Sequence, residues 1–445
     1  MSSVPRDLRQ VNMRTLFESA LSEAHAAVLT ALNQRLNQLL AEAVAVLLGR
    51  QRYERRGHVP RTVQGGACPH CHRRQSKHFS RHGGRWRTVT TCWGDLRIYW
   101  PRARCVCGHC IELNLLGWLA PYQRLGEDVD VLIHRWGGLS LSLRQMAREL
   151  EHTYIGPLAL RTLNLRLHQL KDLTPDLATT AAPPVLLVDG FYITQIRPNG
   201  EYRTDAKGRR RAVKGRFKRC LLVALGIWPE TGRQEVLAWA LTEGEDFTAW
   251  LNFLGQLEAA GISVEHGLEL IIHDGSGGLG SALRFLDLGV ALQRCVFHKL
   301  RNIAQALVLS DELEADVRQR KRRSILRDFK AIWQAKHYAT ALRRYLAVWR
   351  KYRAEQPAAV ATLRRDFRAT VAYYHIAQTH PTWSLTLLRT TSRLERFNRR
   401  LRKHCRAAGA YHSDDGILAM VAQVADEAFQ PRPPSERVCY IVPTT

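Results

Sequence analysis

The chain has 445 residues, too many for one ordinary hydrophobic core, and this length favours two to four domains. Its 66 Lys and Arg residues outnumber 40 Asp and Glu and give a formal net charge of +26, so nucleic acid is the expected partner. An apolar content of 45% excludes a disordered chain, and no apolar run approaches the ~20 residues that a membrane helix needs.

The N-terminal residues 1–60 are expected to form a helical region. Leu, Val and Phe residues recur at helical spacing between residues 16 and 40, and Gly49 is the expected end of the helix. The start of the chain has no apolar signal-peptide core, which predicts a cytoplasmic, nucleoid-associated protein without a membrane partner. In that compartment the ten cysteines are expected to be reduced or metal-bound.

A small β-rich module with two CxxC pairs is predicted over residues 61–120. The pairs lie thirty-five residues apart and flank two β-rich runs that meet at a Gly-Asp turn. Two CxxC pairs joined by a hairpin are the arrangement of a zinc ribbon, because each pair presents two thiolates to one ion. We therefore expect one Zn²⁺ with four thiolate ligands, namely Cys68, Cys71, Cys107 and Cys110.

The ligand set of this ribbon has alternatives. Cys105 could pair with Cys110 in place of Cys107, and all of these cysteines could instead be unligated. Cys92 lies within the hairpin and is interpreted as a packing residue. Three histidines could each replace a thiolate, namely His70, His72 and His109.

Residues 121–175 are expected to form a helical DNA-binding module. Short glycine turns separate three helical stretches, and this spacing is similar to a helix-turn-helix, although three helices with short turns also occur for other reasons. The last helix, over residues 158–170, could lie in a major groove. The Pro-, Ala- and Thr-rich residues 174–184 are the expected linker to the next domain.

An α/β core is predicted to begin at residues 183–299. Five strands are expected, at 185–193, 220–228, 235–243, 268–274 and 290–295. A basic loop joins the first two strands, and a helix over residues 246–261 with Asp246 as its cap follows the third. Three antiparallel strands, a helix, a parallel strand, a helix and another strand are the order of a ribonuclease H-like domain.

Two of these strands carry an acid that can serve metal chemistry. Asp189 lies in the middle of the first apolar strand, where a carboxylate is costly without a partner or a metal, and Asp274 ends the fourth. In the expected fold the two acids are neighbours, as a pair of Mg²⁺ ions about 4 Å apart on one phosphate requires. The alternative for each is an ordinary Asp-Gly turn.

A third acid is expected from the basic helix over residues 390–406. Glu395 lies beside a buried face, formed at helical spacing by Leu394, Phe397 and Leu401. The alternative is a surface acid that pairs with Arg399 four residues on. Basic residues of the loop and of this helix are the candidate phosphate contacts, namely Arg209, Arg210, Arg211, Lys214, Arg393, Arg396, Arg400 and Lys403.

Three stretches resemble the Mutator-type DDE transposases of bacterial insertion sequences. They are LLVDGFYI around Asp189, HDGSGGLG with CVFHKLRN from Asp274 to Asn302, and TTSRLERFN around Glu395. The CxxC pairs depart from the usual member of this family and indicate an added N-terminal zinc ribbon. The resemblance implies catalytic roles for the three acids and active-site support from three further residues, namely Cys295, His298 and Asn398.

The resemblance also implies the remaining domain organisation and the activity. Residues 300–385 would be a helical insertion, residues 386–430 the second part of the core, and residues 431–445 a tail. The chain would cleave and join DNA with two Mg²⁺ or Mn²⁺ ions. Asp189 and Asp274 would hold both ions, and Glu395 would hold the second. Its partners would be double-stranded DNA, both terminal inverted repeats and target, bound by a homodimer or higher oligomer.

Two other functions fit the same sequence. One is a catalytically inactive, transposase-derived protein that binds DNA sequence-specifically, which the loss of one acid would favour. The other is a metal-dependent nuclease or resolvase on the same fold, which would not need the N-terminal modules. All three acids are present, and this favours the transposase.

Overall fold

The computed structural model describes most of the chain, in two compact units that are treated separately below. The described residues are 13–48, 52, 67–113, 115, 116, 119, 122–172, 182–310, 312 and 314–429. The first unit runs to residue 166 and the second from residue 167. The expected linker lies mostly outside the described residues, as does the tail.

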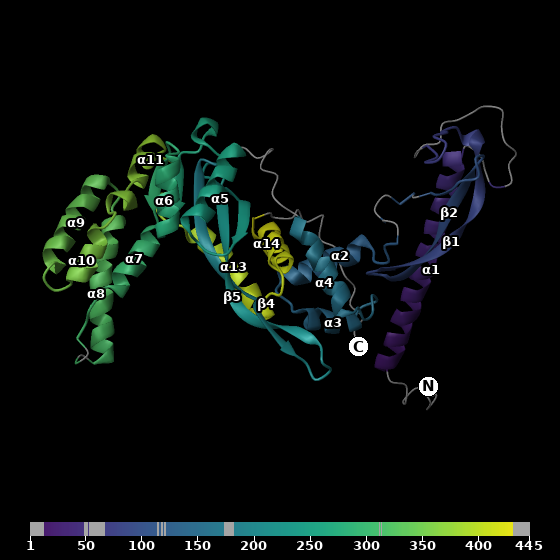
Figure 1. The fold of residues 1–445 in the computed structure, drawn as a ribbon, viewed down its shortest axis with the longest axis horizontal. Coiled ribbons are helices and arrows are strands. Elements are labelled where there is room, and N and C mark those ends of the chain that lie inside the picture. Colours follow the sequence, from purple (N-terminus) through teal and green to yellow (C-terminus); the bar gives the residue numbers. More distant parts are fainter. Residues whose placement is uncertain are drawn as a thin grey trace, which may run out of the picture. The chain divides into compact units, whose positions relative to one another are not determined.

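The first unit combines one long helix with a three-stranded antiparallel sheet of order β1-β2-β3 (Figure 1). Its elements are α1 (Met13–Leu48), η2 (Ser76–His78), β1 (Phe79–Thr91), β2 (Gly94–Cys105), β3 (Cys110–Glu112), α2 (Glu127–Gly138), α3 (Leu143–Glu151) and α4 (Leu160–His168). The expected N-terminal helix, the hairpin turn at Gly94 and the three helices of residues 121–175 are all found.

Helix α1 is joined to the hairpin by apolar packing and by hydrogen bonds. Leu40 packs with Val89 and Trp100, and Val44 packs with Phe79. β3 pairs with β2 only at residues 102–104, so an edge of β2 remains before them. The side-chain oxygens of Asn33 and Asn37 accept hydrogen bonds from the amides of residues 97 and 99, at 2.6 and 2.7 Å, and thereby satisfy this edge.

The second unit is built on a five-stranded sheet of order β6-β5-β4-β7-β8. The strands are β4 (Val185–Thr204), β5 (Arg210–Trp228), β6 (Arg233–Thr242), β7 (Leu270–His273) and β8 (Ala291–Arg294). β4, β5 and β6 are antiparallel, whereas β7 and β8 continue the sheet in parallel from β4. This is the strand order expected from the sequence.

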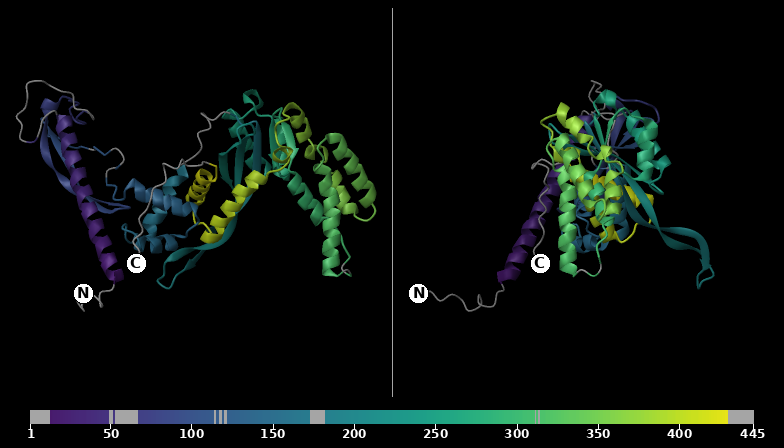
Figure 2. Two further views of the ribbon diagram at one scale, coloured as in Figure 1. Left: turned by 180° about the vertical axis from the view of Figure 1, so that it is seen from behind. Right: turned by 90° about the vertical axis from the view of Figure 1, so that its left-hand side faces the viewer.

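Helices cover both faces of this sheet (Figure 2). On one face Leu186 and Val188 pack with α5 (Phe247–Ala259) and α6 (Gly277–Leu286), and Asp246 caps α5 through the amide of Ala249 at 2.8 Å. On the other face Val185 and Leu187 pack with the C-terminal helices. Successive side chains of a strand alternate between faces, so Asp189 points to the side of the C-terminal helices.

The expected helical insertion is helical throughout the residues that the structure describes within it. Its elements are the end of α7 (Val296–Gln305), then α8 (Ala315–Trp333), α9 (Tyr338–Tyr352), α10 (Pro357–Arg364), η5 (Arg368–Thr370), α11 (Tyr373–Thr379) and the start of α12 (Leu385–Leu388). The unit also contains η3 (Gln169–Asp172), η4 (Val264–His266), α13 (Ser392–Ala408) and α14 (Asp414–Phe429). None of the described helices has the length and apolar composition of a bilayer span.

The basic segment between the first two strands differs from the expected loop. β4 and β5 continue past the sheet as a two-stranded arm, which Figure 1 shows extending beyond the helices, and only residues 205–209 form the turn. The carboxylate of Asp205 closes this turn by accepting hydrogen bonds from the amides of Lys207 and Arg209 at 3.0 and 2.9 Å. The arm has no buried face, so its residues lack the apolar alternation that predicts a strand.

Candidate active site and metal centres

Asp189 is buried within β4, and its two carboxylate oxygens are both held. Only 8% of the residue is exposed. Oδ1 accepts a hydrogen bond from the amide of Gly190 at 3.1 Å, and Oδ2 accepts one from Nδ2 of Asn398 at 2.9 Å. Asn398 lies on α13, so this contact joins two segments that are 209 residues apart in the chain. A fixed carboxylate is what a rigid metal site requires.

Asp274 lies next to Asp189 because of the strand register. Val188 pairs with His273 across the parallel strands β4 and β7, so the following residue of each strand is one of the two acids. Oδ1 of Asp274 accepts a hydrogen bond from the amide of Ser276 at 2.8 Å, which fixes the carboxylate at the start of α6. The two aspartates therefore share one edge of the sheet.

Glu395 is brought to the same region by α13. Leu394, Phe397 and Leu401 are fully buried in the core, as the sequence predicted. Glu395 lies one turn before Asn398, which bonds Asp189, and its Oε1 is 3.7 Å from Nε2 of His298. Oε1 of Glu395 and Oδ1 of Asn398 are buried without a hydrogen-bond partner among the described residues.

The charges of these acids act on one another. Burial, followed by the charges of Asp274 and Glu245 and more weakly that of Glu395, raises the pKa of Asp189 to about 8. Burial raises the pKa of Glu395, although Arg301, Arg399 and Arg402 oppose this shift. Carboxylate oxygens are the donors that a hard divalent ion such as Mg²⁺ takes, so these side chains are the candidate ligands for one.

Cys295 and His298 lie directly behind Glu395. The side chains of Cys295, His298 and Glu395 offer ligand atoms that all lie within 4.8 Å of one another. The hydroxyl of Thr391, at the start of α13, donates to the Cys295 sulfur at 3.2 Å, and this bond ties α13 to the end of β8. Burial lowers the pKa of His298, so this imidazole is neutral near pH 7 and does not form an ion pair with Glu395.

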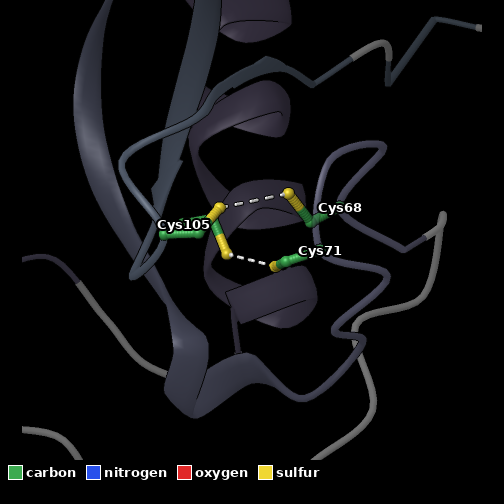
Figure 3. Close-up of side chains that lie close together, drawn as sticks. Cys68, Cys71 and Cys105 are labelled. Atoms are coloured by element: carbon green, nitrogen blue, oxygen red, sulfur yellow. Dashed lines mark hydrogen bonds between the residues drawn. The ribbon is translucent and has the colours of Figure 1, made fainter.

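The first unit contains a separate cluster of four cysteines. Figure 3 shows the side chains of Cys68, Cys71 and Cys105 pointing toward one another. Their sulfurs and that of Cys107 all lie within 4.8 Å, with Cys68 to Cys107 at 3.7 Å and Cys71 to Cys105 at 3.5 Å. Four thiolates around Zn²⁺ at ~2.3 Å lie about 3.8 Å apart, so the cluster fits a tetrahedral zinc site.

This set contains Cys105 and lacks Cys110. The sequence predicted Cys110 as a ligand, with Cys105 as the alternative. Cys105 is the last residue of β2, and β3 returns with Cys110 opposite Arg104. Cross-strand partners share a face, so Cys110 lies on the exposed face of Arg104 and Cys105 on the buried one. The alternation of strand side chains thus decides between the two cysteines.

One thiol of the cluster is set to ionise. Burial opposes the charge of Cys68, but hydrogen bonds from the backbone of Cys71 and His70 and from the thiols of Cys107 and Cys71 lower its pKa to about 6. A thiolate is the form that binds a metal. His70 and His109 stack with ring centroids 6.1 Å apart, outside the four-sulfur set.

Comparison with known proteins decides the family. Residues 203–430, just over half of the chain, match the protein family described as "Transposase, Mutator family". The chain belongs to this family. The matched residues of this Mutator-family chain include Asp274 and Glu395 together with the surrounding Cys295, His298 and Asn398, whereas Asp189 lies before the matched range.

Curated relatives of this Mutator-family chain carry the names of insertion-sequence transposases. The transposase for IS406 of Burkholderia multivorans is 30% identical over 248 residues, which is 54% of this chain and 59% of the relative. The transposase for IS905 of Lactococcus lactis is 24% identical over 332 residues, 73% of this chain and 71% of the relative. The chain thus spans about three fifths of the IS406 protein. A solved Drosophila P element transposase strand transfer complex is 10% identical, with a TM-score of 0.41 over 71% of this chain and 95% of that one.

The predicted DNA contacts of this Mutator-family chain lie on two surfaces of the second unit. On the arm, Arg209 lies in the turn, and Arg210, Arg211 and Lys214 are exposed on β5. On α13, Arg393 is half-buried, whereas Arg396, Arg400 and Lys403 are exposed. Of the four predicted contacts on the arm, Arg211 forms an ion pair with Asp205 at 3.0 Å, and Arg209, Arg210 and Lys214 have no ion pair among the described residues.

A pocket adjoins the acids on the side of α13. It has a volume of about 590 Å³ and lies between β4 and the end of α13. Aromatic and basic side chains line it, including Phe191, Tyr192, Tyr411, Arg402 and Arg406. This lining combines groups that contact bases with groups that contact phosphates.

One acid of this region was not singled out from the sequence. Glu245 precedes α5 and is half-buried beside the two aspartates. Its Oε1 accepts a hydrogen bond from the hydroxyl of Ser276 at 2.8 Å. The local sequence Glu-Gly-Glu-Asp contains three acids with no pattern that separates their roles.

Proposed function

We propose that the chain is a DNA transposase that cleaves DNA at the ends of a mobile element and joins the freed ends to a target. The observation that carries this proposal is the meeting of three segments at one edge of the sheet. Asp189 from β4, Asp274 after β7 and Glu395 from α13 come from positions up to 206 residues apart, and Asn398 bonds Asp189 directly. We further propose that this α/β unit is a ribonuclease H-like domain, on the basis of its strand order.

Mg²⁺ or Mn²⁺ would be held by the three acids. Such ions, when bound, polarise phosphoryl oxygens and make water or a 3′-hydroxyl a better nucleophile. The chain's own part is to hold the carboxylates still: Asn398 and the Gly190 amide fix Asp189, and the Ser276 amide fixes Asp274. Neutral His298 lies against Glu395 without adding a charge that would compete with a cation.

Binding of the DNA backbone is assigned to the basic surfaces. The arm and α13 carry exposed Arg and Lys side chains, and the pocket between β4 and α13 adds Arg402 and Arg406. In the first unit we propose that the four-cysteine module is a zinc ribbon and that α2, α3 and α4 form a helix-turn-helix-like module. Both would hold terminal repeats, acting in a dimer or higher oligomer.

The proposal is tested with DNA that carries both flanks of the chain's own reading frame. Purified protein with Mg²⁺ or Mn²⁺ should cut at the element ends and join them to a plasmid, and a chelator should abolish both steps. Binding of this DNA without any cutting under either ion would contradict the proposal and favour the inactive DNA-binding protein. Cutting without joining would favour a nuclease or resolvase.

DNA affinity should fall steeply with salt. The net charge of +26 and the exposed arm motivate this prediction: if about six or more phosphates are neutralised, the affinity should fall about a thousandfold or more between ~50 and ~200 mM salt. The measurement is fluorescence anisotropy on a labelled duplex without divalent ions. A flat salt dependence would show that the basic surfaces do not meet phosphates.

A matched pair of variants locates this effect. Arg210 on the arm lies over the Tyr202 ring at 4.1 Å, and Arg233 on β6 lies over the Trp228 ring at 4.3 Å. Arg210→Ser should reduce the slope of log affinity against log salt by about 0.9 if one phosphate contact is lost. Arg233→Ser, whose arginine is already paired with Glu235, should leave the slope unchanged. Equal slopes for the two variants would contradict the assignment of the arm.

A further inference from the structure

We propose that Glu245 is a fourth carboxylate of the metal site, joining Asp189, Asp274 and Glu395 in holding the catalytic cations. This inference rests on the proposed function of the site and adds a ligand to it. Glu245 lies in the short segment between β6 and α5, on neither strand nor helix, so its role depends on its contacts.

A single residue connects Glu245 with Asp274. The amide of Ser276 donates to Oδ1 of Asp274 at 2.8 Å, and the hydroxyl of Ser276 donates to Oε1 of Glu245 at 2.8 Å. The backbone of α6 also lies tightly against the segment, because a Cβ atom at position 278 would be 2.6 Å from the carbonyl oxygen of Glu245. Only glycine fits there, so the position of Glu245 relative to Asp274 is closely fixed.

The Glu245 carboxyl group also lies against the backbone beside Asp189. A Cβ atom at position 190 would be 2.8 Å from Cδ of Glu245 and 3.0 Å from Oε2. Gly190 immediately follows Asp189 on β4, so any larger residue there would displace the carboxyl group. Glu245 therefore touches the backbone next to Asp189 and, through Ser276, the residue that holds Asp274, so its carboxyl group approaches the two aspartates from the side of α5 and α6.

The Glu245 carboxyl group is half-buried and lies near other acids instead of a basic partner. Glu245 forms no ion pair with a lysine or arginine in the described part of the chain, although the sequence contains 66 such residues. Glu243, two residues earlier, is paired with Arg197 and Arg219 at 2.7 and 2.6 Å.

A second observation indicates a ligand beside Asp189. Asn398 is 95% buried and donates to Asp189, yet its Oδ1 has no hydrogen-bond partner among the described residues. Oε1 of Glu395 is also a buried atom without a hydrogen-bond partner among the described residues, although its side chain is partly exposed and His298 lies 3.7 Å away. A polar atom buried in this way is stable only with a partner, and a hydrated cation supplies one to several oxygens at once.

The test is a titration of the full-length protein with Mn²⁺, which follows the free ion by electron paramagnetic resonance, alongside DNA cleavage. Glu245→Gln keeps the shape of the side chain and the acceptor for Ser276 but removes the charge. It should weaken Mn²⁺ binding by about tenfold or more, because even the loss of a residue that only supports metal ligands lowers metal affinity ~10–100-fold. Glu245→Asp keeps the charge and should retain part of the binding. Glu258→Gln, an exposed acid on α5, is the matched control and should leave binding and cleavage unchanged.

The outcomes separate this inference from the function on which it rests. If Asp189→Asn loses Mn²⁺ binding while Glu245→Gln binds like the parent protein, Glu245 only anchors Ser276 and the inference fails alone. If the parent protein binds no Mn²⁺, or Asp189→Asn binds like the parent, the proposed metal site itself fails. Thermal unfolding of each variant shows that a loss of binding does not come from misfolding.

Discussion

Replacing any one of Asp189, Asp274 or Glu395 by its amide should reduce DNA cleavage and joining about a thousandfold or more, while DNA binding survives. Two-ion chemistry depends on carboxylate charge for several kcal/mol of transition-state stabilisation, and about 4 kcal/mol corresponds to a factor of a thousand. The amides keep the shape of each side chain, and binding depends on Arg and Lys residues elsewhere. Cleavage assays and anisotropy on the same duplex measure the two effects.

Glu395 is the acid whose place in the site depends most on the tertiary structure, because a long helical insertion separates it from the two aspartates in the chain. Its helix is held at its start by Thr391 on Cys295 and by the amide of residue 296 donating to the carbonyl of Arg389 at 2.9 Å. If the Glu395→Gln variant cleaves DNA like the parent protein, Glu395 is not part of the active site. The Glu258→Gln variant is the control for the loss of a surface charge. Loss of DNA binding in all three variants would instead indicate a structural role.

The core of the second unit could be predicted because its signals are local. A run of apolar residues with one acid marks β4, and the spacing of Leu394, Phe397 and Leu401 marks the buried face of α13. The order of strands and helices then placed Asp189 beside Asp274. What sequence spacing alone could not give is the contact between Asn398 and Asp189, which depends on how α13 packs across the sheet.

The arm and Glu245 show the opposite case. The arm is formed by strands without a buried face. Its residues are therefore mostly charged and do not show the apolar alternation by which a strand is predicted. In the sequence Glu-Gly-Glu-Asp, Glu243 pairs with arginines, Asp246 caps α5 and Glu245 faces the aspartates. These three roles follow from neighbours that are distant in the chain, and residue type alone does not distinguish them.

Three of the four cysteines that the sequence predicted as zinc ligands lie in the observed cluster, and the difference has a geometric origin. The motif rule favours Cys107 and Cys110 as a CxxC pair, whereas the pairing of β2 with β3 turns Cys110 to the exposed face. The backbone closes this turn early, with the amide of Gly108 donating to the carbonyl of Cys105 at 2.8 Å. Register, which a spacing motif does not contain, therefore selects Cys105.

Cys105→Ser should remove zinc from the protein and loosen the module, whereas Cys110→Ser should keep both zinc and structure. Cys105 is buried in the same apolar cluster as Val44, Leu48 and Phe79, so the metal and the packing of α1 on the hairpin stabilise one another. Structural zinc sites contribute on the order of 10–16 kcal/mol, enough to decide whether a small module folds. Zinc per chain by mass spectrometry and hydrogen exchange over residues 67–113 measure the two effects.

The pair of serine variants is decisive because the two substitutions are chemically identical and lie five residues apart on opposite faces of one hairpin. Zinc loss only in Cys110→Ser would restore the CxxC set and show that the β2–β3 register changes when metal binds. Zinc retained in both variants would require a histidine such as His109, whose ring stacks on His70, to complete the coordination. Zinc loss only in Cys105→Ser is the result that the observed geometry predicts, because the Cys105 sulfur lies 3.5 Å from that of Cys71.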